Sequence, residues 1–215
     1  GLSFGQAAQL VFNGSVAGDP YIVFNTAGTV TPTYLVIDNP AANAIVQTPA
    51  NAGNIKSEHE NNRIRWTNYN TTNTYVVPFT TASNVKMPLT VQKTTTGAGA
   101  AGNDSLSFVF ATYSYRVITP PPGSEWQNVN YMPTGVTHMN DFGLGSVDNS
   151  ENAIDRFWII DPQQAGYAYT TKPDITSIFK YDQAEVTGGN LTNGGIDPTT
   201  TLGAQRFNQP LQKWG

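Results

Sequence analysis

The sequence predicts an all-β protein with a β-sandwich or jelly-roll-like fold, in which antiparallel sheets are joined by long loops. Many short segments alternate apolar and polar residues with a period of two, as half-buried strands do. The strand-favouring residue Thr occurs 27 times, and the turn formers Asn, Gly and Pro occur 21, 20 and 14 times. No segment repeats apolar residues with helical spacing over three turns. These observations together favour recurring strands over helices.

Short strands are expected at residues 9–12, 21–24, 34–37, 63–66, 75–77, 89–92, 106–115, 157–160 and 175–181. Residues 63–66 read Arg-Ile-Arg-Trp, and this alternation predicts a half-buried strand at the water-facing edge of a sheet. Residues 157–160 read Phe-Trp-Ile-Ile, a continuous apolar run typical of a central strand that is covered on both faces. No internal repeat is apparent.

The first residues have two interpretations. Leu2 and Phe4, with the small residues through Ala7, are similar to the tail of a secretory signal peptide cleaved after Ala7 or Ala8. A short N-terminal strand is the other interpretation. We therefore expect residues 1–8 to be the remnant of a signal peptide. Residues 9–215 are expected to form a single sandwich-type domain, a fragment of a longer exported protein.

Composition and charge exclude several kinds of chemistry and of binding partner. A chain of 215 residues is long enough to bury a core without a disulfide or a metal. It contains no Cys, which excludes disulfides, thiolate catalysis and Cys-ligated zinc. The formal net charge is −4 and the basic residues are scattered, so we expect no nucleic-acid partner. No apolar stretch approaches the roughly 20 residues of a spanning helix, so the chain is not expected to span a membrane.

A cluster of oxygen-bearing side chains predicts a calcium site. Asp148, Asn149, Glu151 and Asp155 lie within eight positions, and calcium accepts six to eight oxygen ligands in irregular loops. The cluster lacks the Gly and the terminal Glu of an EF-hand loop. The alternative is a region of Asx turns that precedes a strand. No other cofactor is expected.

The two histidines of the chain are candidate catalytic groups. His59 lies between Glu58 and Glu60, and a neighbouring carboxylate would raise its pKa toward that of a general base. The alternative is a solvated charged turn that leads into a strand. His138 lies near several Asp residues, which is compatible with a metal or a catalytic pair, or with a ring that fixes its loop. No HExxH spacing supports zinc.

Aromatic residues in or near loops predict a glycan site. Trp126, Tyr131 and Tyr113, with His138 nearby in sequence, are the candidate ligand-binding residues. Trp126 follows Pro-Pro-Pro-Gly-Ser-Glu and is the ring that we expect to be most exposed. The alternative is that these rings pack in the core or against loops.

Several segments in order resemble a known group of proteins. They are residues 34–39, 58–66, 131–139, 147–150, 155–161, 169–173, 181–185 and 204–208. The run Asp-Arg-Phe-Trp-Ile-Ile-Asp at 155–161 is the most specific of them. The set resembles the N-terminal β region of surface and secreted proteins of Bacteroidota that look like type IX secretion substrates. The resemblance implies a secreted or outer-surface location and no particular activity.

These observations predict a non-catalytic secreted or cell-surface module for adhesion or extracellular structure, with a glycan or a surface as partner. A carbohydrate-binding module is the first alternative. The second is a hydrolase with an acidic site around Asp148 and Asp155. No GxSxG, P-loop or GxGxxG motif occurs in the chain.

Overall fold

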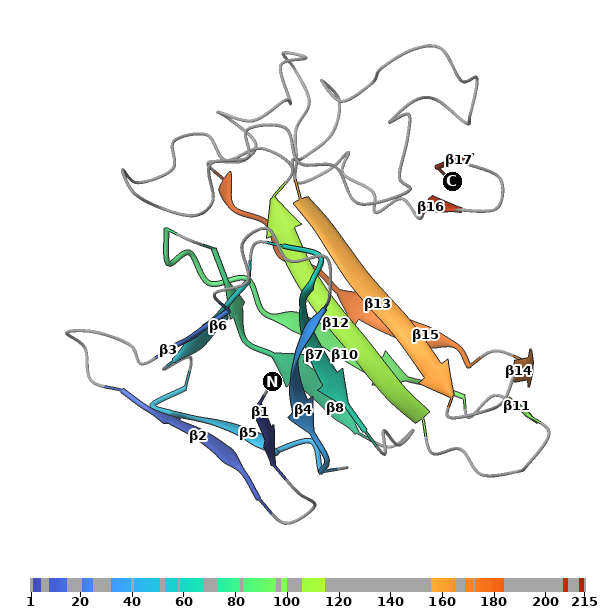
Figure 1. Ribbon diagram of the computed structural model, residues 1–215, viewed down its shortest axis with the longest axis horizontal. Helices are drawn as coiled ribbons and strands as arrows, with labels where there is room; N and C mark the ends of the chain where they lie inside the picture. The colour runs from blue at the N-terminus through green and yellow to red at the C-terminus, as the bar shows by residue number, and fades with distance from the viewer. Residues whose placement is uncertain are drawn as a thin grey trace. The chain divides into compact units, whose positions relative to one another are not determined.

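The computed structural model describes residues 2–4, 8–14, 21–24, 32–39, 41–50, 53–57, 59–67, 73–81, 83–95, 98–99, 106–114, 156–164, 169–171, 173–183, 207–208 and 213–214. All of its named elements are strands, which confirms the all-β class (Figure 1). The strands are β1 (Leu2–Phe4), β2 (Leu10–Asn13), β3 (Tyr21–Val23), β4 (Thr33–Ile37), β5 (Ile45–Thr48), β6 (Asn54–Lys56), β7 (Asn62–Trp66), β8 (Thr74–Val77), β9 (Phe79–Thr80), β10 (Leu89–Lys93), β11 (Ala98–Gly99), β12 (Leu106–Ser114), β13 (Arg156–Gln164), β14 (Tyr169–Thr171), β15 (Ile175–Ile178), β16 (Phe207–Asn208) and β17 (Lys213–Trp214).

The first nine strands wind as three stacked coils. Coil 1 contains β1, β2 and β3, coil 2 contains β4, β5 and β6, and coil 3 contains β7, β8 and β9. The strands β1, β4 and β7 pair in parallel, as do β2 and β5, and β3, β6 and β9 (Figure 1). Strand β8 leaves this stack and pairs with β10. The prediction of antiparallel sheets therefore holds for the later strands, whereas the coils are parallel. The coils are also an internal repeat that the sequence did not reveal.

Apolar side chains form ladders through the coils. Ile22 of β3 lies beside Ile55 of β6, and Ile55 lies beside Phe79 of β9. Leu35 of β4 lies beside Ile64 of β7, and all of these except Ile22 are fully or almost fully buried. Because paired residues point to the same face, each ladder buries apolar surface continuously from one coil to the next.

The later strands cover coil 3. Strand β12 pairs antiparallel with β7, which gives a five-stranded sheet in the order β1-β4-β7-β12-β13. Strands β15, β10 and β8 form an antiparallel sheet of three. The rings of Trp66 in β7 and Tyr75 in β8 meet edge to face, with centroids 4.8 Å apart. A second pair, Trp158 of β13 and Phe179 after β15, has centroids 5.0 Å apart. Aromatic contacts thus join the two sheets in a sandwich-like arrangement.

Asn39 fastens the turn after β4 to the core. Its side-chain amide donates to the carbonyl of Ala8 at 2.9 Å, and its Oδ1 accepts from the N–H of Ala41 at 2.9 Å. Its own carbonyl accepts from Nε1 of Trp66, which is fully buried. The side chain and main-chain carbonyl of one buried residue therefore satisfy polar groups of coils 1, 2 and 3.

Two strand positions differ from the prediction. Residues 63–66 were expected at a sheet edge, but β7 lies in the middle of the five-stranded sheet. Residues 157–160 were expected in a central strand, but β13 is the last of the described strands in that sheet, and Trp158, Ile159 and Ile160 are only half-buried. Arg65 is accommodated centrally because its side chain lies on the face opposite the core and stacks on Tyr34.

The chain divides into two compact units. Residues 1–113 with 158–180 form the first, and residues 114–157 with 181–215 form the second. In the first unit, Leu2–Phe4 form a strand, as one of the two interpretations of the N-terminal residues expected, while cleavage after Ala7 or Ala8 stays a prediction. Among the described residues, no helix has the length and apolar character needed to cross a membrane.

Candidate functional site

The outward face of the β15-β10-β8 sheet is the candidate site. Thr90 in the central strand lies directly between Val76 and Ile178, and Gln92 lies directly between Thr74 and Thr176. These six residues are called the outer face below. The alternating residues of β8 and β10, such as Tyr75 and Leu89, are buried on the opposite side. The outer face is therefore the solvent side of a sheet whose other side is core.

The outer face is exposed and uncharged. Ile178 is 58% exposed and Val76 is 39% exposed, while Thr74 and Thr176 are also exposed. None of the six side chains carries a charge. The nearest charged residues along β15 are Asp174 before the strand and Lys180 after it, both exposed. A partner that lies on this face therefore meets methyl groups, hydroxyls and one amide.

The outer face is also stiff. Five of its six residues are the β-branched types Thr, Val and Ile, whose χ1 angles are restricted. Neighbouring strands lie about 4.8 Å apart, and residues on one face repeat about every 6.8 Å along a strand. The side chains thus form a regular array that loses little conformational entropy when a partner covers it.

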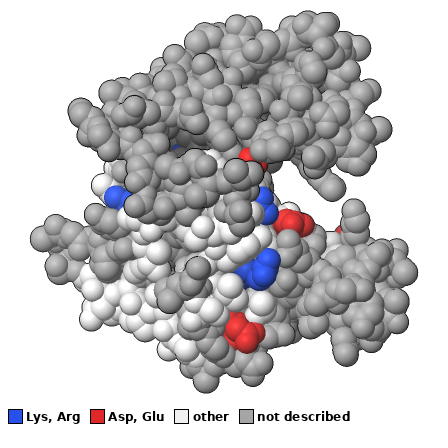
Figure 2. All heavy atoms as spheres, in the orientation of Figure 1, with Lys and Arg blue, Asp and Glu red and all other residues white. Residues whose placement is uncertain are grey.

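Charge is sparse on the visible described surface as well. In Figure 2, isolated Lys, Arg, Asp and Glu side chains are separated by white, uncharged residues. The low part of the described surface, where Figure 1 places β2 and β5, is white. The chain as a whole has only 12% charged residues, so a neutral surface follows from its composition.

His59 fixes a turn. Its Nδ1 accepts a hydrogen bond from the N–H of Asn61 at 3.1 Å, and its carbonyl accepts from the N–H of Asn62 at 3.0 Å. Burial lowers the pKa of His59 below its ordinary value of 6.5, and the nearby carboxylate of Glu60 opposes this shift only in part. The raised pKa expected of a general base is therefore wrong, because desolvation outweighs the carboxylate. The nitrogen that would accept a proton is engaged in the turn that starts β7.

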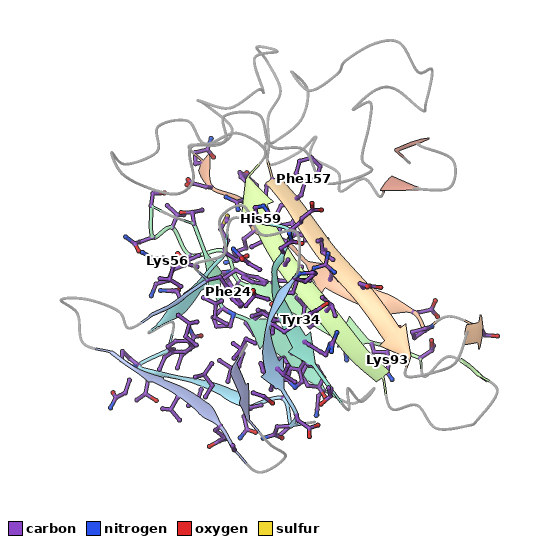
Figure 3. All side chains as sticks on the ribbon, in the orientation of Figure 1. Phe24, Tyr34, Lys56, His59, Lys93 and Phe157 are labelled. Carbon is purple, nitrogen blue, oxygen red and sulfur yellow. The ribbon has the colours of Figure 1, made fainter. Side chains whose placement is uncertain are left out.

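Arg65 and Tyr34 form a cation–π pair on the five-stranded sheet. The guanidinium carbon of Arg65 lies 4.1 Å from the ring centroid of Tyr34. Both residues are half-buried and come from the neighbouring parallel strands β7 and β4. Figure 3 shows Tyr34 on β4, with His59 at the start of β7. The pair anchors a charged side chain on a central strand without a carboxylate.

Lys93 is a further charged residue of interest. It ends β10 on the core side and is fully buried (Figure 3). Its ammonium group is not accessible to an external partner, so Lys93 belongs to the interior of the sandwich and not to the outer face.

The residues predicted for binding are largely outside the described part of the chain. The candidate calcium ligands Asp148, Asn149, Glu151 and Asp155 lie there, as do Trp126, Tyr131 and His138. The remaining candidate, Tyr113, lies in β12, and only its backbone is described. Within the described residues, no group of three or more His, Asp or Glu could hold a metal. The calcium and glycan sites therefore stay predictions.

The outer face itself was not singled out from the sequence, although a signal is present. Leu-Thr-Val-Gln-Lys at 89–93 alternates apolar with uncharged polar residues, and Ile-Thr-Ser-Ile at 175–178 places Thr176 and Ile178 on one side. The alternation identifies which residues share a face, but the pairing of β8, β10 and β15 is needed to bring them together.

In comparisons with known proteins, no family model, curated protein or solved structure matches the chain.

Proposed function

We propose that this protein is a non-catalytic secreted or cell-surface module for adhesion or extracellular structure, and that the outer face is its contact surface. The observation that carries the proposal is the uncharged array of the exposed Thr74, Val76, Thr176 and Ile178 around the half-buried Thr90 and Gln92. Binding to such a face needs no charge complementarity, so it favours a neutral partner. The absence of Cys and the low charge content are compatible with an exported location.

A carbohydrate-binding role is the second candidate. Hydroxyl, amide and methyl groups alternate on the outer face, and neutral polysaccharides present hydroxyls and C–H groups with the same mixed character. The stiffness of the β-branched side chains lowers the entropic cost of covering an extended, regular partner. The hydrolase alternative rests on Asp148 and Asp155 and stays a prediction.

The experiment measures retention of the purified chain on insoluble neutral polysaccharide particles and on uncharged plastic beads. The tested variant is Thr90→Lys with Ile178→Lys, which places two ammonium groups in one row of the outer face. The control is Val85→Lys, at an exposed residue in the turn between β9 and β10. Matched thermal melts confirm that each variant is folded.

We expect wild type and Val85→Lys to be retained equally. Binding of the outer-face variant should be at least about tenfold weaker, because burying an unpaired charge costs more than about 1.4 kcal/mol. Retention on polysaccharide alone would favour the carbohydrate-binding role, and retention on both materials general adhesion. Failure of wild type to bind either material, or equal loss in both variants, would contradict the proposal.

A further inference from the structure

Coil 1 is an open end of the stacked coils. Each of its strands β1, β2 and β3 is the terminal strand of its sheet among the described strands. On the other side, β7 of coil 3 is covered by β12. Stacked repeats need a terminal unit with a polar outer surface, because an uncovered end exposes both backbone groups and the core.

The backbone of coil 1 directs hydrogen-bonding groups toward this end. The N–H of Leu10 donates to the carbonyl of Ala44 and the N–H of Gly14 donates to the carbonyl of Thr48. Residues alternate in the side to which their backbone groups point. Val11 and Asn13 therefore direct their N–H and C=O groups away from β5, toward the side of β2 on which no described strand lies.

The apolar core is also incompletely covered at this end. Ile22 in coil 1 is only half-buried, whereas Ile55, the next residue of the same ladder, is 0% exposed. On the outward faces of coil 1, Val11 is 55% exposed and Val23 is 46% exposed. A further layer of strands against coil 1 would cover backbone and apolar surface at the same time.

The described residues of coil 1 lack the charged side chains and Pro that commonly protect an edge strand. Natural edges are guarded by charged side chains, Pro or bulges, which prevent pairing with other chains. The first charged side chain of the sequence is Asp19, and the described residues of coil 1 include no charged residue and no Pro. The described edge residues of two copies can therefore approach one another without facing like charges.

We propose that the open end of coil 1 is a self-association surface that pairs β2 with β2 of a second copy. A two-fold axis beside Phe12 makes the strands antiparallel and sets Val11 of one copy opposite Asn13 of the other. The outward groups of both residues then find partners reciprocally. The second copy fits because an isologous contact needs a self-complementary, uncharged edge. This inference does not depend on the proposed function of the outer face.

The test is sedimentation equilibrium of the full chain over a wide range of concentrations. Val11→Lys with Val23→Lys adds charged edge residues at exposed positions of coil 1, and Val76→Lys with Ile178→Lys is the matched control at equally exposed positions of the outer face. We expect wild type and control to form dimers reversibly, and the coil 1 variant to require at least about tenfold higher concentration.

Amide hydrogen exchange at low and high protein concentration is the second measurement. Pairing predicts that the amides of Val11 and Asn13 become at least about tenfold slower to exchange in the dimer, while that of Val85 is unchanged. A wild type that stays monomeric throughout, a control as impaired as the coil 1 variant, or a dimer without protection at Val11 and Asn13 would each overturn the proposal.

Discussion

The side chain of Phe12 lies directly against the backbone of Gly53. A β-carbon built on Gly53 would come within 2.2 Å of both Cβ and Cγ of Phe12, and Gly53 has a φ of +74°. Phe12 is 4% exposed, so it has little room to move away. The position just before β6 therefore requires glycine for two reasons, the close approach of coil 1 and the left-handed backbone.

This contact predicts a large effect of Gly53→Ala. The left-handed conformation alone costs a non-glycine residue about 1–2 kcal/mol, and the overlap with Phe12 adds to it. We expect the free energy of unfolding to fall by about 3 kcal/mol or more in urea melts. In a Phe12→Gly background, which removes Cβ as well as Cγ, the same substitution should cost only the backbone part. Equal costs in both backgrounds would show that the two residues are not in contact.

Asn39 gives a second prediction. Asn39→Ala removes two part-buried hydrogen bonds, to the carbonyl of Ala8 and from the N–H of Ala41, and each contributes about 0.5–1.5 kcal/mol to stability. Thermal and urea melts should show that loss. Asn39→Asp retains the acceptor for Ala41 but not the donor to Ala8, and it buries a charge, so we expect no rescue at neutral pH. Unchanged stability of both variants would contradict the role of Asn39 in holding the turn after β4 against the core.

His59 predicts a specific dependence of stability on pH. Its pKa in the folded chain is below 6.5, the value expected when unfolded, so the unfolded state binds the proton more tightly. Its contribution is fully present above pH 6.5 and is lost as pH falls through the lower, folded pKa. His59→Asn keeps a side-chain acceptor for the Asn61 N–H and cannot titrate. Urea melts should therefore show a smaller loss of stability on acidification for His59→Asn than for wild type; identical pH profiles would contradict this account.

The pair Arg65 and Tyr34 predicts a modest coupling. The free energy of a half-buried cation–π contact is about 0.5–2 kcal/mol. A double-mutant cycle with Arg65→Met and Tyr34→Leu should give a coupling in this range, because both replacements keep the bulk of the side chains. Arg65→Lys should retain part of it. A coupling of zero would mean that packing of the arginine stem, and not its charge, holds the ring.

The sequence predicted the faces of the strands better than their neighbours. Alternation at residues 63–66 correctly predicted a strand with one buried face, which Ile64 and Trp66 form, but it did not show that parallel β4 and antiparallel β12 lie on either side. Alternation of apolar and polar residues identifies the face of the sheet that a side chain occupies, but it does not determine which strands pair. For the same reason, the apolar run at 157–160 did not distinguish a central strand from the last one.

The coils cannot be recognised from the sequence because the number of residues in each coil varies. Leu2 and Leu35 are 33 positions apart, Leu35 and Ile64 are 29 apart, and Ile55 and Phe79 are 24 apart. A repeat without a fixed period leaves no self-similarity for sequence comparison within the chain. The outer face could not be predicted for a related reason. Thr90, Val76 and Ile178 meet only after strands distant in sequence have paired.

The parallel stacking of the coils is tested most directly by engineered disulfides, because the chain has no native Cys. Val11 and Val46 are register partners on the outward faces of β2 and β5, whereas Gln47 points to the other face. Neighbouring strands lie about 4.8 Å apart, within the Cα separation that a disulfide spans. We predict that Val11→Cys with Val46→Cys cross-links readily under mild oxidation and that Val11→Cys with Gln47→Cys does not. Cross-linking of the second pair in preference to the first would contradict the coiled architecture.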